Sequence, residues 1–359
     1  MAIRKCKRCL ITDKVPGVRI DNQGICNLCT AHDTQDNAAS DQQRLDFEAN
    51  LEQTLTTTRG AGEYDCIVPL SGGKDSVYLL YKLKTDYPHL RLLAFTTDIN
   101  IPPIAWDNIR RVIAKLAIDH VVYRPPETFY RKLFRYILTH QEERGAVYSV
   151  SYVYAPLFEG DAIKLAIEKQ VPLVLAGYSP GQPEPERMLY EFSRTLIEQV
   201  SWLPPELARS DQFSNDELHR FFDPQCYAQE TRFPRYLAPF HAWRYDQEAI
   251  MKQVVQLGLV RSSRHASPIF SNYPINWLLM YSDLKHFGYN PYLPEFATLI
   301  REGKANRKQW QVLGPIVDFM IKHKVLLAAE VRRSLRWLGL SEDQLSINKP
   351  HGAYDPPAL

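Results

Sequence analysis

From residue 64 onward the chain alternates between short apolar runs and amphipathic stretches. Runs of strand type occur at four places, Asp65–Leu70, Leu92–Thr97, His120–Tyr123 and Pro172–Ala176. Helical patterns fall between them at Ser76–Thr85, Ala105–Ala117, Glu127–Glu143 and Gly160–Lys169. Near-continuous apolar strands separated by amphipathic helices indicate an α/β fold with a doubly wound, mostly parallel sheet. Such folds bind ligands at the edge formed by the carboxyl ends of the strands.

The regions on either side have different patterns. Residues 34–60 are polar and predict a short helix and linker, whereas Gly314–Leu340 is helical in pattern and predicts a small bundle packed on the sheet. The expected division is a ribbon at 1–35, a linker helix at 36–60, a sheet domain at 61–200, and a further region at 201–359 that ends in helices.

Composition narrows the possible functions. The 359 residues are 45% apolar and 23% charged, which is ordinary for a soluble globular protein. A net charge of +2 gives no strong attraction to DNA or RNA, so a nucleic-acid partner is not expected. No apolar run reaches the roughly 18 residues of a membrane span, and the charged N-terminus lacks a signal-peptide core. We therefore expect a cytoplasmic protein.

The stretch at residues 64–76, YDCIVPLSGGKDS, carries the most specific chemical signal. A strand runs into Ser71, Gly72 and Gly73, and a helix opens at Lys74–Asp75–Ser76. Paired glycines bring backbone N–H groups close to a ligand at a helix N-terminus, which favours a polyphosphate. The spacing fits neither the Walker loop nor Gly-x-Gly-x-x-Gly. The alternative is a plain glycine turn.

Four of the six cysteines form two Cys-x-x-Cys pairs, Cys6 with Cys9 and Cys26 with Cys29. Two such pairs, with turn-forming residues between them, favour a structural Zn²⁺ held by four thiolates; a redox pair and chance are the alternatives. Cys66 lies in a predicted strand and is expected to be buried. Cys226 lies in a stretch of loop character and is either incidental or catalytic.

Two other strand ends are expected at the same edge of the sheet. Asp98 follows the second strand and either fixes a nucleoside or caps the helix that begins after Pro103. Gly177 follows the fourth strand, in a loop over residues 176–182, and either admits a nucleotide closely or makes an ordinary turn.

Ser-Gly-Gly-Lys-Asp-Ser resembles the PP-loop of the ATP pyrophosphatases, which have an adenine nucleotide alpha hydrolase-like fold and cleave ATP between its α- and β-phosphates. The ribbon and loop together resemble the N-acetyl sugar amidotransferases of surface-polysaccharide biosynthesis. The matching positions are Cys6, Cys9, Pro16, Gly24, Cys26, Cys29 and Ser71–Ser76. A later stretch, Leu299–Gln309, resembles a helix start near that family's C-terminus, although Gln309 and Trp310 replace a small residue. Residues 183–298 match poorly.

The resemblance implies a reaction in which an amide or carbonyl oxygen attacks the α-phosphate of ATP, pyrophosphate leaves, and a nucleophile then expels AMP. Backbone N–H groups at Gly72–Asp75 would hold the departing diphosphate, and Lys74 would neutralise charge. Ser71 and Ser76 would donate hydrogen bonds. Asp75 would orient Mg²⁺ or, alternatively, stabilise the first turn of the helix.

The nucleophile decides the function. The leading hypothesis is ammonia, which converts the N-acetyl group of a nucleotide-activated sugar to an acetamidino group. We expect no glutaminase segment in the chain, so a separate glutaminase subunit would supply the ammonia. A second hypothesis is sulfur transfer to a tRNA or small molecule with Cys226 as the carrier. A third is a non-catalytic nucleotide-binding protein.

The middle region contains polar groups suited to a sugar or amide. Residues 265–276 predict a loop in which Ser271, Asn272 and Asn276 are candidate substrate residues, although two prolines also suit a rigid connector. Asp246 is a candidate helix cap. Three arginines, Arg244, Arg261 and Arg264, either pair with a phosphate or are ordinary surface residues.

Overall fold

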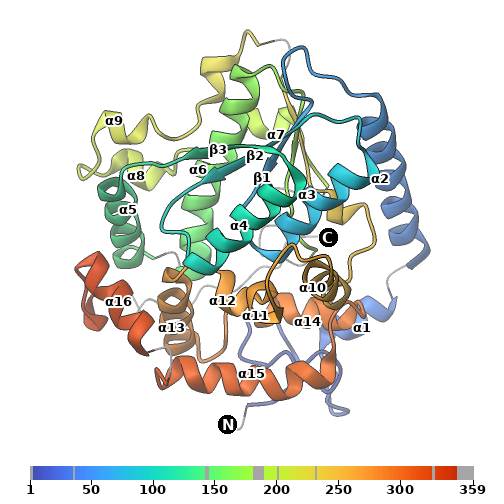
Figure 1. Ribbon diagram of the computed structural model, residues 1–359. Coiled ribbons are helices and arrows are strands. Elements are labelled where there is room, and N and C mark those ends of the chain that lie inside the picture. The colour runs from blue at the N-terminus through green and yellow to red at the C-terminus, as the bar shows by residue number, and fades with distance from the viewer. Residues whose placement is uncertain are drawn as a thin grey trace.

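The computed structural model describes residues 3–34, 37–141, 145–180, 190–199, 202–230, 233–325 and 328–345. A six-stranded sheet lies at its centre (Figure 1), with the strand order β3-β2-β1-β4-β6-β5. The sheet is parallel except for β5, which is antiparallel to its neighbour β6. In chain order the strands are β1 (Cys66–Pro69), β2 (Leu92–Thr97), β3 (Asp119–Tyr123), β4 (Leu173–Leu175), β5 (Glu191–Phe192) and β6 (Arg235–Leu237).

Both faces of the sheet are buried, because successive side chains of a strand point to opposite sides. In β1, Cys66 and Val68 belong to one apolar core, whereas Ile67 belongs to a second core on the other face. Strands β2 and β4 divide their side chains between the two cores in the same way. This alternation explains why the strands read as continuous apolar runs in the sequence.

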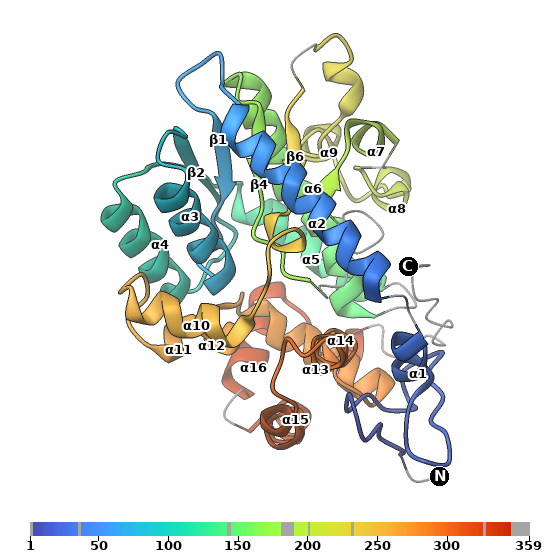
Figure 2. The ribbon, with the colours of Figure 1, turned by 90° about the vertical axis from the view of Figure 1, so that its right-hand side faces the viewer.

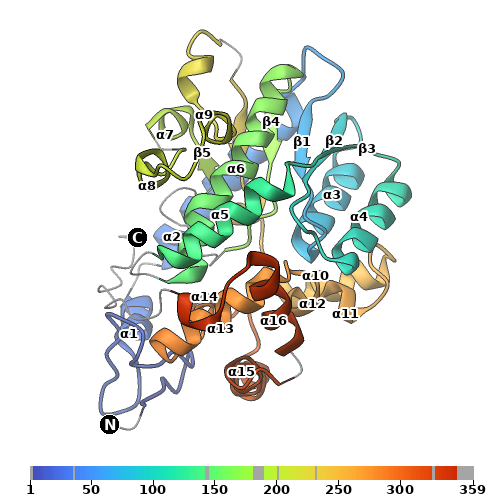
Figure 3. The ribbon, with the colours of Figure 1, turned by 90° about the vertical axis from the view of Figure 1, so that its left-hand side faces the viewer.

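Helices cover each face. The first core is closed by α2 (Asn37–Thr57), α3 (Lys74–Asp86), α4 (Pro103–Leu116) and α10 (Gln247–Gln256). The second core is closed mainly by the later part of α6 (Ala146–Glu168) and by α7 (Arg194–Gln199). Figure 2 shows α2 crossing one face of the sheet, and Figure 3 shows α6 on the other. The result is a three-layer α/β arrangement.

A helical region lies below the sheet in Figure 1. Its central helix, α13 (Ile275–Phe287), packs against α6, α15 (Arg307–Lys322) and α16 (Ala328–Leu338). Asp283 of α13 accepts the backbone N–H groups of Ala146 (2.5 Å) and Val147 (2.9 Å), and so caps the first turn of α6. The remaining helices are α5 (Glu127–Thr139), α8 (Pro205–Arg209), α9 (Asn215–Leu218), α11 (Ser263–Ala266), α12 (Pro268–Ser271), α14 (Leu293–Arg301) and the 3-10 turns η1 (Pro224–Tyr227), η2 (Pro239–His241) and η3 (Glu342–Gln344).

The N-terminal ribbon, with α1 (Asn27–Thr34) at its end, folds around its own cysteine-rich core. Isolated β-bridges join Lys5 to Thr12 and Ile20 to Cys26. The ribbon packs on α14 through Ala297, which is fully buried in the ribbon's core. Contacts with the C-terminal helices therefore hold the ribbon in place.

The structure confirms the strands predicted from the sequence, and Leu92–Thr97 matches residue for residue. Helix α6 is longer than predicted and begins at Ala146. The polar stretch before the sheet forms one helix of 21 residues instead of a short one. The helix predicted over Glu127–Glu143 ends earlier, at Thr139, and its predicted last residues, 142 and 143, lie outside the described residues, as do Gly181 and Gln182. Within the described residues, no helix is both long and apolar enough to cross a membrane.

The prediction of a loop over residues 265–276 is wrong. The stretch holds the end of α11, all of α12 and the first residues of α13. Its two prolines explain the difference, because Pro268 is the first residue of α12 and Pro274 is the N-cap of α13. Proline is well tolerated at helix starts, where its missing N–H needs no partner.

Candidate functional site

The loop at residues 71–73 follows β1, a strand in the interior of the sheet, and leads directly into α3. Gly72 has a φ of +79°, and a Cβ added there would lie 2.4 Å from the carbonyl oxygen of Ala105 in α4. No other residue type fits this position without a backbone shift. Gly73 is the N-cap of α3 and leaves the helix without a side-chain cap. The first N–H groups of α3 are therefore available to an anion.

Two serines line the loop. The hydroxyl oxygens of Ser71 and Ser76 are 3.2 Å apart, and the Ser76 hydroxyl also donates to the carbonyl of Gly73 at 3.1 Å. The N–H of Gly73 donates to the Ser71 hydroxyl at 3.4 Å. The loop thus has two hydroxyl groups and a set of backbone donors in one place, which suits the oxygens of a phosphate.

Lys74, Asp75 and Tyr245 form a three-membered polar network beside the loop. The Lys74 ammonium lies 2.5 Å from Asp75 Oδ2 and donates to the Tyr245 hydroxyl at 3.2 Å. The Tyr245 hydroxyl donates to Asp75 Oδ1 at 3.0 Å. Burial, followed by the charge of Asp75, raises the pKa of Tyr245 well above its ordinary value. Tyr245 is therefore a neutral donor that orients the Lys74–Asp75 pair.

Glu295 on α14 faces the same network. The charges of Lys74 and Asp75 both act on its partly buried carboxyl group. Burial raises the pKa of Glu295 to about 8, and the charge of Lys74 lowers it only in part. No local pattern indicates a role for Glu295, because it lies more than two hundred positions from the loop and only folding brings it near Lys74. Tyr245 belongs to the polar stretch before α10, where the sequence predicts only a role for Asp246 as the helix cap. Asp246 does accept the N–H of Ala249 at 2.9 Å.

Asn108 fixes the loop from the side of α4. Its fully buried amide group donates to the carbonyl of Gly72 at 2.9 Å and to the carbonyl of His265 at 2.9 Å. The sequence did hold a signal for this residue, because Asn108 is polar on a helix face that is otherwise apolar at Ala105, Ile109 and Val112. A buried amide on such a face needs carbonyl partners, and the phosphate loop supplies one.

Asp98 and Gly177 lie at the predicted edge, near the ends of β2 and β4. Asp98 is buried, accepts the N–H of Ile101 at 3.4 Å and pairs with Arg124 at 2.8 Å. Through these two contacts, Asp98 stabilises the turn that follows β2. A Cβ at Gly177 would lie 3.0 Å from the backbone of Ser76, so this glycine lets the end of β4 approach the first turn of α3. A role for either residue toward a nucleoside stays a prediction.

A second polar cluster occupies the same edge on the α6 side. The Tyr178 hydroxyl donates to Glu159 Oε1 at 2.8 Å, and the Thr97 hydroxyl donates to Asp161 Oδ2 at 3.3 Å. Burial raises the pKa of Asp161 to about 7, with the charge of Lys164 opposing it. The sheet edge therefore carries ionisable groups on both of its faces.

The hydrogen bonds of the four candidate substrate residues do not join them into one site. The Ser271 hydroxyl donates to the Ser267 carbonyl within one helical turn, and Asn272 Oδ1 accepts the N–H of Tyr273. Asn276 is buried and accepts from the Tyr292 hydroxyl at 2.8 Å, which ties α13 to α14. Arg244 is exposed. A role in substrate binding for these four residues stays a prediction.

Cys226 is exposed, and Cys66 is buried as expected. The Cys226 thiol contacts Asp223 Oδ2 at 3.5 Å, and this hydrogen bond raises the pKa of the thiol. Its neighbour Tyr227 packs in the core on the α6 face of the sheet, whereas α3 belongs to the other face. Cys226 is therefore a poor thiolate, held on the side of the sheet away from Lys74.

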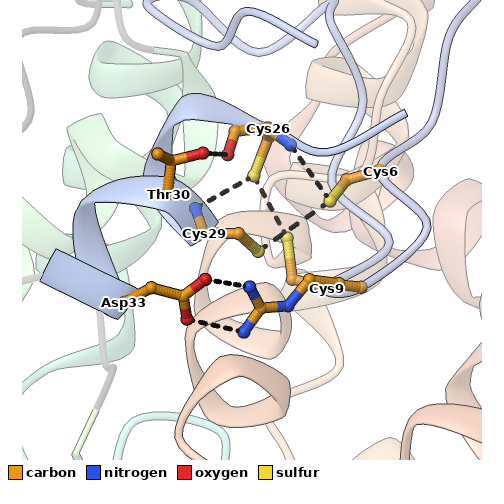
Figure 4. A network of polar contacts seen from close by, with 7 residues as sticks. Cys6, Cys9, Cys26, Cys29, Thr30 and Asp33 are labelled. Carbon is orange, nitrogen blue, oxygen red and sulfur yellow. Dashed lines mark hydrogen bonds and ion pairs between the residues drawn. The ribbon is translucent and has the colours of Figure 1, made fainter. Parts of the chain in front are cut away.

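The four ribbon cysteines converge as the spacing predicts (Figure 4). Their sulfur atoms all lie within 4.8 Å of one another, with 3.8 Å between Cys6 and Cys29 and 3.6 Å between Cys9 and Cys26. A tetrahedral ion with metal–sulfur bonds of about 2.3 Å sets its sulfurs about 3.8 Å apart. The residues thus fit a single ion better than a four-iron cluster, whose thiolates each bind a different iron and stand further apart. Asp33 pairs with Arg8 beside the cysteines.

We expect one Zn²⁺ per chain, measurable by elemental analysis of protein purified without added metal. Removal with a chelator is expected to unfold the ribbon, because four thiols cannot hold it alone. Cys9→Ser should lose the metal, whereas Cys226→Ser, which changes an exposed thiol elsewhere, should keep it. Iron with visible absorbance in place of zinc would contradict this assignment.

Gly72→Ala is expected to lower the free energy of unfolding by more than about 1 kcal/mol and to weaken ATP binding, because Ala strains at positive φ and displaces α4. Gly314→Ala in α15 is the matched control, since nothing lies within 4 Å of the added methyl group. It should stabilise slightly through helix propensity. Equal effects of the two substitutions in thermal melts and ATP titrations would refute the role of Gly72.

Glu295→Gln tests the buried carboxyl group. Because its pKa rises from 4.5 to about 8 on folding, the unfolded chain releases this proton first, and stability falls as pH rises between those values. We expect the wild type to lose stability relative to Glu295→Gln between pH 5 and pH 8 in denaturant titrations. The exposed Glu248→Gln is the control. Parallel pH curves for wild type and Glu295→Gln would contradict the assignment.

No protein-family model matches the chain, and no curated protein sequence matches it. Among solved structures, U34-tRNA thiolase NcsA from Methanococcus maripaludis with its [4Fe-4S] cluster is 13% identical, with a TM-score of 0.38, over 99% of this chain and 94% of that chain. An NH3-dependent NAD synthetase from Campylobacter jejuni is 13% identical, with a TM-score of 0.34, over 86% and 98%. NMN synthetase from Francisella tularensis is 11% identical, with a TM-score of 0.34, over 89% and 98%. Likenesses this weak do not assign the chain to a family.

Proposed function

We propose that the chain is a cytoplasmic, ATP-dependent amidotransferase of the PP-loop type. In this proposal it adenylates an amide oxygen, releases pyrophosphate and replaces that oxygen with ammonia. The observation that carries the proposal is the loop of residues 71–76. An uncapped helix start, a glycine turn that only glycine can make, and Lys74 beside Asp75 lie together after an interior strand of a parallel sheet.

The chain's own groups suit the first step. The N–H groups of α3 and the hydroxyls of Ser71 and Ser76 would hold the β,γ-diphosphate, and Lys74 would neutralise its charge. Asp75 would hold Mg²⁺, which supplies further charge neutralisation on the phosphates. Before ATP binds, Lys74 and Asp75 are paired with each other. Binding would exchange that contact for contacts with the nucleotide, while Tyr245 keeps both side chains in place.

The proposed reaction has two steps, adenylation of the acceptor and displacement of AMP by ammonia. The amide oxygen of the acceptor attacks the α-phosphorus, the bond from that phosphorus to the bridging oxygen breaks, and pyrophosphate leaves. Ammonia then adds to the amide carbon and loses a proton, and AMP departs with the original oxygen. Proximity and charge stabilisation are the enzyme's main contributions.

The acceptor we propose is the N-acetyl group of a nucleotide-activated sugar, with ammonia from a separate glutaminase. The resemblance of the ribbon and loop to N-acetyl sugar amidotransferases supports this choice. The net charge of +2 supports a small acceptor over a nucleic acid.

Sulfur transfer is the second candidate, since Cys226 is an exposed thiol that a persulfide carrier would need. Its raised pKa and its place on the α6 face of the sheet favour ammonia instead. The two nucleophiles give products of different mass, which makes the choice testable.

Mass spectrometry of a panel of nucleotide-activated N-acetyl sugars, incubated with the protein, Mg-ATP and ammonium or sulfide, tests the proposal. We expect a loss of about one mass unit with ammonium, since NH replaces O, together with pyrophosphate release. A gain of about 16 mass units with sulfide, together with no change in mass with ammonium, would overturn the proposal in favour of sulfur transfer. Lys74→Ala should abolish pyrophosphate release, whereas Lys82→Ala on the same helix and Cys226→Ser should not.

A further inference from the structure

An open groove of about 520 Å³ lies beside α4. It runs along one face of that helix and reaches the turn that follows α10. Its volume falls within the range of small-molecule sites. The groove is lined by Asp107, Arg110, Arg111, Ala114, Lys115 and Gly258.

The groove has an excess of positive charge. Its one acid, Asp107, is already held by the Arg261 guanidinium through two contacts of 2.7 Å. Across the described residues, Arg110, Arg111 and Lys115 take part in no ion pair. Arg111 and Lys115 are four residues apart on one helix, where like charges repel. Three cations held together in this way favour an anionic ligand.

The surroundings of Arg110 and Arg111 also restrict where these two side chains can lie. The Nε of Arg111 is buried without a hydrogen-bond partner in the described part of the chain, so the guanidinium is partly packed and its stem is held in place. The Arg110 guanidinium lies 5.6 Å from the Trp106 ring centroid and is therefore partly fixed in position. Gly258, with a φ of +64°, turns the chain tightly opposite Lys115.

The groove begins next to the loop. Asp107 at its end precedes Asn108, which donates to the carbonyl of Gly72. Asp107 also lies 3.8 Å from His265. From Asp107 to Lys115 the helix extends roughly 12 Å. A ligand anchored at Arg111 and Lys115 would therefore lie within roughly 12 Å of the turn of α4 that contacts the loop.

We propose that this groove binds the diphosphate of the nucleotide-activated acceptor. Arg110 and Arg111 contact the phosphate oxygens through their planar forks, and Lys115 adds a third charge. This inference rests on the proposed function and names the acceptor's anchoring site. A short diphosphate satisfies three cations set along one helix face, whereas a long nucleic acid needs a wider basic surface than this chain has.

The test uses pyrophosphate as the probe, titrated calorimetrically into full-length protein saturated with a non-cleavable ATP analogue that fills the loop. We expect Arg110→Ala/Arg111→Ala to weaken pyrophosphate binding roughly tenfold or more while binding the ATP analogue as wild type does. Ala keeps the helix, so folding is not at risk. Arg131→Ala/Arg332→Ala is the matched control, because it removes the same charge from exposed positions on α5 and α16.

Equal pyrophosphate affinity in the two double variants would overturn the groove assignment, as would a lack of binding in the wild type. Groove-dependent binding of tRNA without binding of pyrophosphate would overturn it in favour of a nucleic acid. Two other results would contradict the proposed function itself: a wild-type protein that does not bind the ATP analogue, or one that releases no pyrophosphate from ATP. Those two measurements do not depend on the groove.

Discussion

Close contact between backbones at the carboxyl edge of the sheet determines where the loop and the start of α3 lie. The carbonyl of Ala105 in α4 lies where a side chain at Gly72 would begin, and the end of β4 at Gly177 touches the first turn of α3. Side chains at these glycines would push α3 away from both neighbours. With glycine present, α3 starts between α4 and β4, and its free N–H groups open at the edge of the sheet. Asn108 then secures the loop by bonding the carbonyl of Gly72.

The N-terminal ribbon contributes to the same site through α14. Leu293, Ala297 and Ile300 belong to the ribbon's core, and their spacing places them on one side of the helix. Glu295 lies roughly opposite that side, where the charges of Lys74 and Asp75 reach it. Arg307, at the start of α15, donates to the carbonyls of Lys7 at 2.8 Å and Arg8 at 3.1 Å. A closed metal site, inert in itself, would thus fix one wall of the candidate site.

Local sequence predicted much of the fold, because the strands β1 to β4 are apolar runs with clear boundaries. Strands β5 and β6, of two and three residues, are too short to give such a pattern. The first half of α6 was missed because its Tyr, Val and Ser residues and Pro156 disfavour a helix; packing on α13 and the cap from Asp283 outweigh that preference. The loop could be predicted because its motif consists of neighbouring residues. The roles of Tyr245 and Glu295 could not be predicted, because only the folded chain brings them to Lys74.

The balance of charge around Lys74 explains how these distant residues act together. Lys74 and Asp75 neutralise each other, so an ionised Glu295 beside them would leave the site negative and oppose a polyphosphate. Burial on α14 prevents this, because a carboxyl group with a pKa of about 8 is mostly protonated at neutral pH. A protonated Glu295 adds no negative charge and therefore no repulsion. The packing of α14 on the ribbon thereby keeps an added negative charge out of the candidate site, which neither the loop nor the ribbon achieves alone.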